Sequence, residues 1–402
     1  MSKIDELIAE FCPEGVPVSQ LGDVAEVQRG ISISRSDVTE GPVPVLAGGQ
    51  QPSCWHNESN RGGENVVVAG SGAYAGFVSH WMGPIWVSDS FSISGRSNFL
   101  LTKFCFYMLK NRQDELHHMK RGSGVPHVYA KDFAKLFIPV PPIEVQREIV
   151  SILDKFTQLE AELAAELEAR KSQYEHTREQ LLNFSGDLSG HPMSGLIAEL
   201  CPDGVALKAI SKYTLPGGNV DWSKTNESLQ YIDLSAVDRA SGSIGETQTI
   251  TAATAPSRAQ RLIEAGDVIF ATTRPAQMRL ALIPPLSRGH VASTGFCILR
   301  VDAARLLPSF LAHYLKTPPF QMYVKANQIE GNYPSIPDSR VRSFEIPVPP
   351  LEVQREIVSI LDKLDALVND LTFGLPAEIA ARRKQYEYYR NKLLTFKELD
   401  AA

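Results

Sequence analysis

Two long stretches of the chain carry apolar residues on a single helical face. The apolar positions recur at alternating steps of four and three, which is the heptad spacing of a coiled-coil helix. They are Val145, Ile149, Ile152, Phe156, Leu159 and Leu163 in the first stretch, and Val353, Ile357, Ile360, Leu364, Leu367 and Leu371 in the second. Prolines just before each stretch mark a helix start. The pattern predicts helices over residues 143–184 and 351–402, the second interrupted at Gly374-Leu375-Pro376.

The remaining sequence has the shorter apolar runs and turn residues of mixed α/β domains. Residues 17–137 and 206–345 are rich in Gly, Pro and Ser between short β-branched runs. Strands are predicted at residues 66–68, 77–79, 85–87 and 91–94, and at 230–234, 267–270, 280–283 and 296–299. Short helices are predicted within residues 100–119 and 308–324.

The chain is an internal repeat. Residues 138–156 recur at 346–364 with 17 of 19 positions identical, residues 7–16 recur at 196–205, and residues 169–174 recur at 381–386. A tandem duplication predicts a pseudo-twofold α+β fold, with two mixed α/β domains joined by two long helices packed antiparallel as a coiled coil. The domains expected are residues 1–142, a central helix 143–184, residues 185–350 and a final helix 351–402.

The composition argues against a membrane-spanning, secreted or disulfide-rich protein. No run of 18 apolar residues exists, and the first residues lack the apolar centre of a signal peptide. Five cysteines without a C-x-x-C pair argue against a disulfide framework or a cysteine zinc site, and favour the reduced cytoplasm.

Charge is distributed unevenly along the chain. The net charge of −6 argues against nucleic acid, but residues 17–137 carry +1 and residues 206–345 carry +4, while the helices are acidic. Residues 96–137 hold eight basic against three acidic side chains, and residues 258–300 hold six against two. Basic stretches with Ser, Asn, Gln and Tyr suit contacts to DNA phosphates and base edges.

No motif indicates catalysis. The glycines of Gly70-Ser-Gly72-Ala-Tyr-Ala-Gly76 have the wrong spacing for a dinucleotide loop, and a strand follows them. Thr317-Pro-Pro-Phe320 resembles the motif of amino-methyltransferases but lacks its Asn or Asp, and the prolines are expected to end a helix. Walker, H-E-x-x-H and G-x-S-x-G sequences are absent. We expect a non-catalytic chain with no cofactor or metal of its own.

These features together resemble the specificity subunit of type I restriction–modification enzymes. The specific marks are the two copies of Ile-Pro-Val-Pro-Pro-(Ile/Leu)-Glu-Val-Gln-Arg-Glu-Ile-Val-Ser-Ile-Leu-Asp-Lys, the segments 44–50 and 64–72, and the four-residue leucine period at Leu159, Leu163 and Leu167. The resemblance implies two target-recognition domains that each read half of a bipartite, asymmetric DNA site, with the helices as a ruler between them. It also implies a prokaryotic cytoplasmic complex with two methyltransferase subunits and ATP-driven endonuclease subunits, which would bind S-adenosylmethionine, ATP and Mg.

Candidate contact residues follow from the repeat and the charge. Two loops follow the matched strands at equivalent positions, Gly70-Ser-Gly72 and Thr272-Thr-Arg274. Their side chains differ, as expected of two domains that recognise different half-sites. The DNA-binding candidates are Ser71, Gly72, Tyr74, Arg96, Lys120, Arg121, Ser123 and His127, and Thr273, Arg274, Arg279, Lys325, Asn327, Gln328 and Tyr333. The partner-binding candidates are Gln146, Arg147, Gln354 and Arg355, on a repeated polar face of the helices.

Two other functions fit parts of the sequence. A DNA adenine methyltransferase acting alone is opposed by the missing Asn or Asp and the missing cofactor loop, and binding of S-adenosylmethionine would reveal it. A coiled-coil scaffold without a DNA role would lack salt-dependent retention on DNA.

Overall fold

The computed structural model describes residues 3–122, 124–239, 241–285, 289–370 and 372–399, and divides into two compact units. Unit 1 comprises residues 1–162 and 380–402, and unit 2 comprises residues 163–379. Each unit mixes helices and sheets, as the sequence predicts. Each also takes its long-helix segments from both copies of the repeat.

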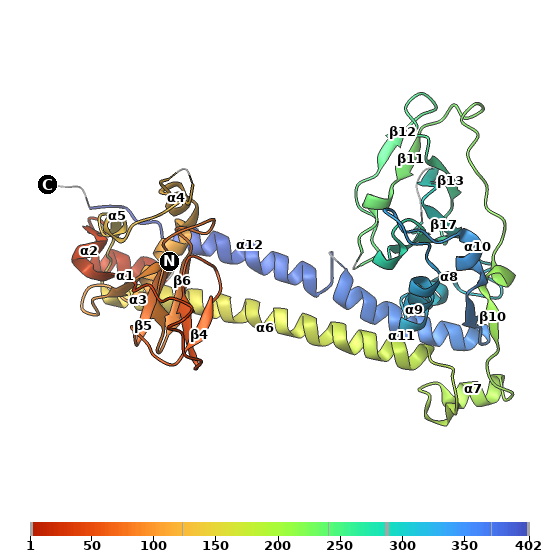
Figure 1. Cartoon of the computed structure of the whole chain (residues 1–402), viewed down its shortest axis with the longest axis horizontal. Coiled ribbons are helices and arrows are strands. Elements are labelled where there is room, and N and C mark those ends of the chain that lie inside the picture. The colour runs from red at the N-terminus through yellow and green to blue at the C-terminus, as the bar shows by residue number, and fades with distance from the viewer. Residues whose placement is uncertain (1–2, 123, 240, 286–288, 371, 400–402) are drawn as a thin grey trace. The chain divides into compact units, whose positions relative to one another are not determined.

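Unit 1 is built from three layers (Figure 1). An antiparallel sheet of order β2-β8-β5-β6 lies between a helical layer and a second sheet of order β4-β3-β7, in which β3 and β7 are parallel. A separate pair, β1-β9, joins the first residues to the strand before the long helix. The elements are α1 (Lys3–Phe11), β1 (Val18–Gln20), α2 (Leu21–Val24), β2 (Ala25–Arg29), β3 (Val43–Leu46), β4 (Cys54–His56), β5 (Glu64–Ala69), β6 (Val78–Met82), β7 (Trp86–Val87), β8 (Ser90–Gly95), α3 (Thr102–Asn111), α4 (Gln113–His118), α5 (Ala130–Phe133), β9 (Phe137–Pro139) and the start of α6 (Ile143–Leu182).

The central strand β5 explains the continuous apolar run in the sequence. Val66 and Val68 face α3 and α6 in one cluster, while Val67 faces Ile85 and Val87 on the other side. A strand covered on both faces needs apolar residues at every position, instead of the alternation of a half-exposed strand.

Unit 2 repeats this arrangement. Its sheets have the orders β15-β14-β17, β12-β11-β16-β13 and β10-β18, and β11 and β16 are the parallel pair. The elements are the end of α6, η1 (Leu188–Gly190), α7 (Ser194–Leu200), β10 (Leu207–Ala209), η2 (Ile210–Tyr213), β11 (Leu229–Ile232), η3 (Leu234–Ala236), β12 (Gln248–Ile250), β13 (Ala259–Ile263), β14 (Val268–Ala271), η4 (Pro275–Gln277), β15 (Leu280–Leu282), β16 (His290–Ser293), β17 (Phe296–Leu299), α8 (Pro308–Tyr314), α9 (Pro318–Asn327), α10 (Asp338–Ser343), β18 (Glu345–Pro347), α11 (Leu351–Asn369) and the start of α12 (Leu375–Leu393).

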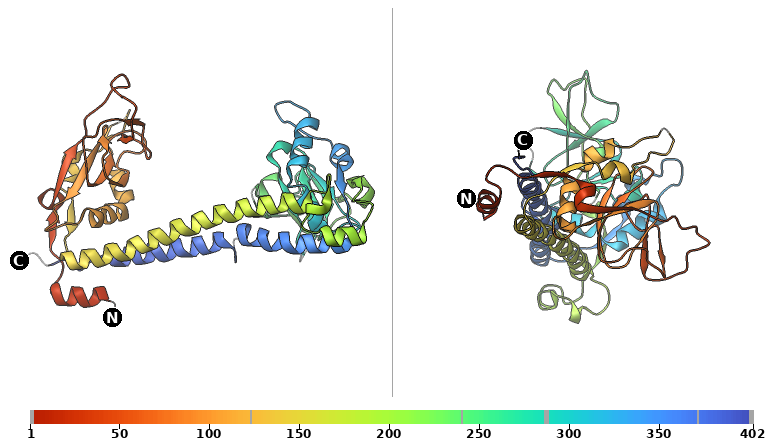
Figure 2. Two further views of the ribbon diagram at one scale, coloured as in Figure 1. Left: turned by 90° about the horizontal axis from the view of Figure 1, so that it is seen from below. Right: turned by 90° about the vertical axis from the view of Figure 1, so that its left-hand side faces the viewer.

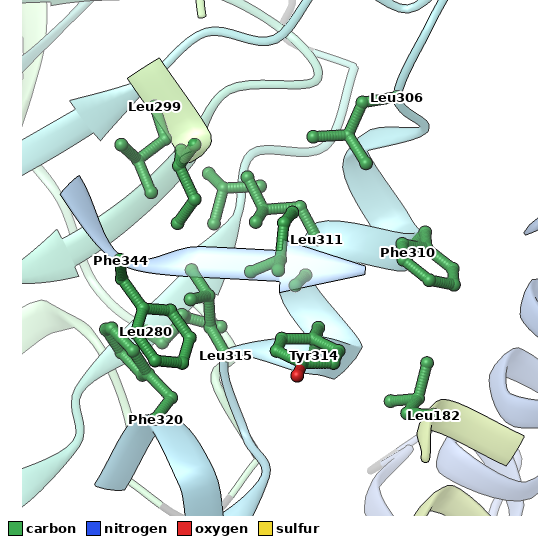
Figure 3. Close-up of a cluster of buried hydrophobic side chains, with 14 of the residues drawn as sticks. Leu182, Leu280, Leu299, Leu306, Phe310, Leu311, Tyr314, Leu315, Phe320 and Phe344 are labelled. Carbon is green, nitrogen blue, oxygen red and sulfur yellow. The ribbon is translucent and has the colours of Figure 1, made fainter. Parts of the chain in front are cut away.

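Aromatic side chains form part of the core of unit 2. Phe310, Tyr314, Phe320 and Phe344 belong to one buried cluster with Leu280 and Leu299 of the sheet (Figure 3). The apolar face of α11, including Val353, Ile357 and Leu361, belongs to the same cluster. The helix predicted over residues 308–324 is two helices, because Pro318 begins α9 after α8 has ended at Tyr314. Thr317 is buried at this junction, and its hydroxyl donates to the Tyr314 carbonyl at 2.6 Å.

The long helices follow the predicted pattern in most respects. Helix α6 is continuous for 40 residues, and the second stretch breaks into α11 and α12 around Gly374, as predicted. Val145 and Ile149 are fully buried, but Leu159, predicted on the same apolar seam, is 46% exposed. This assignment of Leu159 was wrong because the helix opposite is charged at this level, where Arg383 of α12 pairs with Glu160.

Each unit is completed by the helix end of the other copy. In unit 1, Tyr386 and Tyr389 of α12 lie against Phe156 of α6, with ring centroids 6.2 and 5.6 Å apart. Together with the Arg383–Glu160 pair, these contacts run in opposite directions along the parts of α6 and α12 that belong to unit 1, which lie side by side (Figure 2). In unit 2 the equivalent tyrosine, Tyr174 of α6, reaches His313 of α8. The repeated Tyr motif, residues 169–174 and 381–386, therefore packs in each case against the domain formed by the other copy.

Gln146 and Gln354 correct one prediction. Both were placed on an exposed polar face for partners, but both side chains are fully buried. Gln146 Oε1 accepts from the Leu101 N–H at 2.9 Å, and its Nε2 donates to the carbonyls of Phe99 and Pro141. Gln354 makes the same three bonds, with Leu307, Arg305 and Pro349. These glutamines replace backbone partners where the turn before α3 or α8 meets the start of a long helix.

Two further features bear on the sequence expectations. All five cysteines are free thiols, and burial raises the pKa of Cys105 to about 12. Among the described residues, no helix is long and apolar enough to cross a membrane.

Candidate DNA interface

Two loops meet at one edge of the central sheet in unit 1. The loop after β5, residues 70–76, is held to residues 120–128 by backbone bonds from Gly72 N–H to the Pro126 carbonyl (2.9 Å) and from Val128 N–H to the Gly70 carbonyl (3.0 Å). Arg121 and His127 exchange both of their backbone bonds, which pairs these two residues antiparallel. We call residues 70–76 and 120–131 the first loop cluster.

The first loop cluster carries several basic and aromatic side chains. Tyr74 is 47% exposed, and the side chain of Arg121 is 68% exposed. Lys120 Nζ donates to the Ala73 carbonyl at 2.8 Å, so its charge is held over the tip of the other loop. His127 stacks on Tyr129 with ring centroids 6.3 Å apart. Cations beside exposed rings can contact phosphates and stack on or bond to bases.

Unit 2 builds its loops in the same way. Arg274 N–H donates to the Pro334 carbonyl (2.7 Å), Ile336 N–H donates to the Thr272 carbonyl (2.9 Å), and Ile329 exchanges two bonds with Ser335. These bonds reproduce those of Gly72, Val128 and the Arg121–His127 pair. Residues 272–279 and 325–336, the second loop cluster, are therefore equivalent to the first, as the sequence match predicts.

The second loop cluster carries different chemistry on this shared frame. The guanidinium carbon of Arg274 lies 5.2 Å from the centre of the Tyr333 ring, and Tyr333 is 70% exposed. Arg274 has a left-handed backbone with a φ of 51°, which is costly for a residue with a Cβ. Lys325 is also exposed, while Asn327 and Thr273 are half-buried.

Several candidates lie outside these exposed clusters or have other partners. Ser71 is buried with its hydroxyl bonded to Asp89, so it positions the loop instead of facing outward. Arg96 follows β8 at the opposite end of the sheet, where it donates to the Asp23 carbonyl at 3.0 Å. The guanidinium of Arg279 bonds to the Val237 carbonyl. Spacing along a strand reveals neither the burial of Ser71 nor the sheet edge at which Arg96 lies, and the DNA contacts of all three residues stay predictions. Ser123 lies outside the described residues.

Gln328 has a mixed environment. Its Oε1 is buried without a hydrogen-bond partner among the described residues, so this acceptor faces the interior of the loop. Its backbone N–H continues α9 by donating to the Val324 carbonyl.

Sequence reasoning missed Tyr129 and Lys131. Tyr129 is 44% exposed, and the Lys131 ammonium lies 5.8 Å from its ring centre. Both line a cavity of about 400 Å³ beside His127, which Arg29 and Asp89 also line. Their position just after His127, with a ring and a cation two residues apart, is the signal that could have identified them.

Comparisons with known proteins identify the family of the chain. A family model described as the type I restriction modification DNA specificity domain matches residues 13–169 and again residues 207–381. The specificity subunit of the type I restriction enzyme EcoR124I/EcoR124II from Escherichia coli is 26% identical over 415 residues, covering 98% of this chain and 97% of that protein.

Two solved structures share the fold. The S subunit of a type I restriction–modification system from M. genitalium is 15% identical with a TM-score of 0.61, covering 94% of this chain and 96% of that one. A chain solved in relation to complex assembly and conformational transition of the type I R-M system is 17% identical with a TM-score of 0.56, covering 95% and 98%.

The fold thus defines a tandem pair of DNA specificity domains. With both domains matched over most of the chain, the protein belongs to the type I restriction–modification specificity subunit family.

Proposed function

We propose that the chain reads a bipartite, asymmetric DNA site, with the first loop cluster on one half and the second loop cluster on the other. The main support for this proposal is that the two loop clusters have the same backbone hydrogen bonds but different exposed side chains. An identical frame presents both loops to a duplex in the same manner, while different side chains select different base edges. Membership of a DNA specificity family supports DNA as the ligand.

The long helices would hold the two readers at a set distance. Helix α6 runs without a break from unit 1 into unit 2, and α12 crosses the same boundary in the reverse direction. We propose that this pair acts as an antiparallel coiled-coil ruler between the half-sites, with the pseudo-twofold symmetry expected of a duplication.

The chemistry would come from partner subunits. We propose that the chain is non-catalytic and holds no cofactor, and that two methyltransferase subunits binding S-adenosylmethionine and endonuclease subunits using ATP and Mg dock on it. The two nearly identical helix starts support two equivalent docking sites. We propose that the complex works in the prokaryotic cytoplasm, where a genomic DNA target would lie. Binding of S-adenosylmethionine by the chain alone would instead indicate a methyltransferase acting by itself.

Arg274→Ala is expected to relax one position of the DNA site. The Arg274 side chain is exposed beside Tyr333 and can bond to a guanine edge, so its loss should cost about 1–3 kcal/mol of specific binding. The site is first mapped from methylated adenines in the host genome, and affinities are then measured on duplexes varied one base pair at a time.

A matched control separates base reading from charge. Lys224→Ala removes an exposed cation of the same unit outside the second loop cluster, and should leave the methylation pattern unaltered. If Arg274→Ala weakens binding equally on every duplex, the residue contacts a phosphate; if it changes nothing, it is not part of the interface.

Double charge reversal, Arg147→Glu with Arg355→Glu, is expected to weaken assembly with the methyltransferase subunits. Both guanidinium groups are exposed and pair only loosely with Glu144 and Glu352, at 4.0 and 3.7 Å. Their position on the shared helix starts makes them equivalent, so the change should affect both docking sites. Co-purification measures assembly, and an unaltered thermal transition verifies folding. Normal assembly by the folded variant would place the docking surface elsewhere.

A further inference from the structure

The repeated lead-in segments form the same groove in both units. In unit 1 the groove lies between Cys12–Pro17 and the Pro141-Pro142 turn before α6, and in unit 2 between Cys201–Ala206 and the Pro349-Pro350 turn before α11. Because the two lead-ins and the two turns have nearly the same sequence, they should accept the same type of ligand.

The backbone edge beside the groove of unit 1 is paired with the chain itself. Val16 N–H donates to the Lys397 carbonyl at 2.8 Å, and Leu399 N–H donates to the Val16 carbonyl at 3.0 Å, which forms a parallel β-bridge with Glu398. Val16 is 1% exposed as a result. A Cβ built on Gly15 would lie 2.7 Å from the Glu398 carbonyl oxygen, so the close approach of this segment requires glycine there.

The groove of unit 2 has the same edge without the segment. Val205, equivalent to Val16, is half-exposed, and its backbone N–H and carbonyl have no hydrogen-bond partner among the described residues. A Cβ built on Gly204 meets nothing within 4 Å. The chain cannot fill this groove as it does the first, because the residues after α6 turn into α7, with Phe184 stacked on His191 at 5.0 Å.

The charge of the empty groove indicates its ligand. Lys208 and Arg305 line it, with the Arg305 guanidinium 4.6 Å from the Tyr213 ring, and none of the described residues that line it is acidic. In unit 1 the equivalents of these cations are Ser19 and Phe99, and Glu14 lines the groove. A free peptide edge flanked by cations suits an extended acidic segment, which adds by β-augmentation.

We propose that the groove at Val205 binds an extended acidic segment of a methyltransferase subunit, in the manner in which the groove at Val16 holds residues 397–399. This inference rests on the proposed assembly with such subunits. A second copy of the chain is a poorer source, because its own segment is anchored by Leu394, which is 5% exposed, and by Phe396 against Phe104.

A labelled synthetic peptide of residues 395–402 tests the groove directly. The full chain should bind one equivalent, because the backbone edge at Val16 is already paired with residues 397–399 and the edge at Val205 is not. A chain ending at Phe396 should bind two equivalents, and its unit 1 groove serves as the positive control. Failure of the full chain to bind the peptide overturns the proposal, whether or not the shortened chain binds one.

Two variants tie the binding to the named residues. Gly204→Asn adds a Cβ where the segment must pass, in a left-handed position that Asn tolerates, and should abolish binding to the full chain while leaving one site in the shortened chain. Lys208→Glu should weaken binding about tenfold, and a Glu398→Lys peptide should recover it. Binding that either variant leaves unaltered lies elsewhere and contradicts the proposal.

The source of the segment is tested with the assembled complex. If a methyltransferase subunit fills the groove, the peptide should not bind the chain co-purified with those subunits. Equal binding to the free and the assembled chain would exclude them as the source. Because none of these readouts uses DNA, they are independent of whether Arg274 reads a base.

Discussion

Gln146→Ala is expected to destabilise unit 1 by about 3–5 kcal/mol, the largest effect of any single substitution considered. The side chain is fully buried and satisfies the Leu101 N–H and the carbonyls of Phe99 and Pro141. Alanine leaves these three backbone groups without partners, and each unsatisfied group costs about 1–3 kcal/mol. Denaturant unfolding, followed by a probe placed in each unit, measures the change.

The repeat supplies two controls for this experiment. Gln354→Ala should destabilise unit 2 in the same way, through Leu307, Arg305 and Pro349. Arg147 is the next residue of α6, and its side chain is exposed. Arg147→Ala should therefore change the free energy of unfolding by less than about 0.5 kcal/mol. A loss below about 1 kcal/mol in both glutamine variants would mean that water replaces the amide, and that the turns need no such anchor.

Lengthening both long helices by four residues is expected to change the DNA site without changing what either half reads. Helices α6 and α12 both cross the boundary between the units, so the insertions belong after Leu163 and after Ile379. Four residues preserve roughly one helical turn and add about 6 Å. That length is one to two base-pair steps of about 3.4 Å, so the unread spacer should lengthen by about one or two base pairs.

Insertions of two residues provide the contrast. They turn one part of each helix by about 200° relative to the other and should abolish methylation. Methylome sequencing of cells carrying each variant distinguishes the outcomes. A four-residue variant that methylates sites with the original spacer would show that the helices do not set the distance.

Much of the fold was predictable because long helices and buried strands leave strong periodic signals. The apolar spacing from Val145 to Ile149 places residues that are fully buried, and Gly374 does lie at the break between α11 and α12. The parallel pairing of β3 with β7 was not predictable, since two short strands 40 residues apart carry no mark of each other. Periodicity also cannot tell whether a polar residue such as Gln146 is solvated or bonded internally.

The candidate site was predictable only in outline. Alignment of the two copies identified equivalent loops, and the backbone bonds of Gly72 and Arg274 confirm that equivalence. The alignment did not separate Arg96 from the loop residues. Because β8 runs antiparallel to β5, its first residue lies beside the loop after β5, whereas Arg96, which follows its last residue, lies at the other end of the sheet. Which exposed side chains touch bases depends on the position and shape of the bound duplex, which the sequence of the protein does not specify.

The reciprocal closure of the units bears on how such a chain can evolve. Each domain is completed by a Tyr motif from the other copy, through Phe156 in unit 1 and through His313 in unit 2. A genetic crossover within the nearly identical stretches 138–156 and 346–364 therefore exchanges one divergent block for another and leaves both long helices with their Tyr motifs as they were. A single recombination can join two unrelated readers on an unaltered scaffold, so new target combinations arise without the core having to be rebuilt.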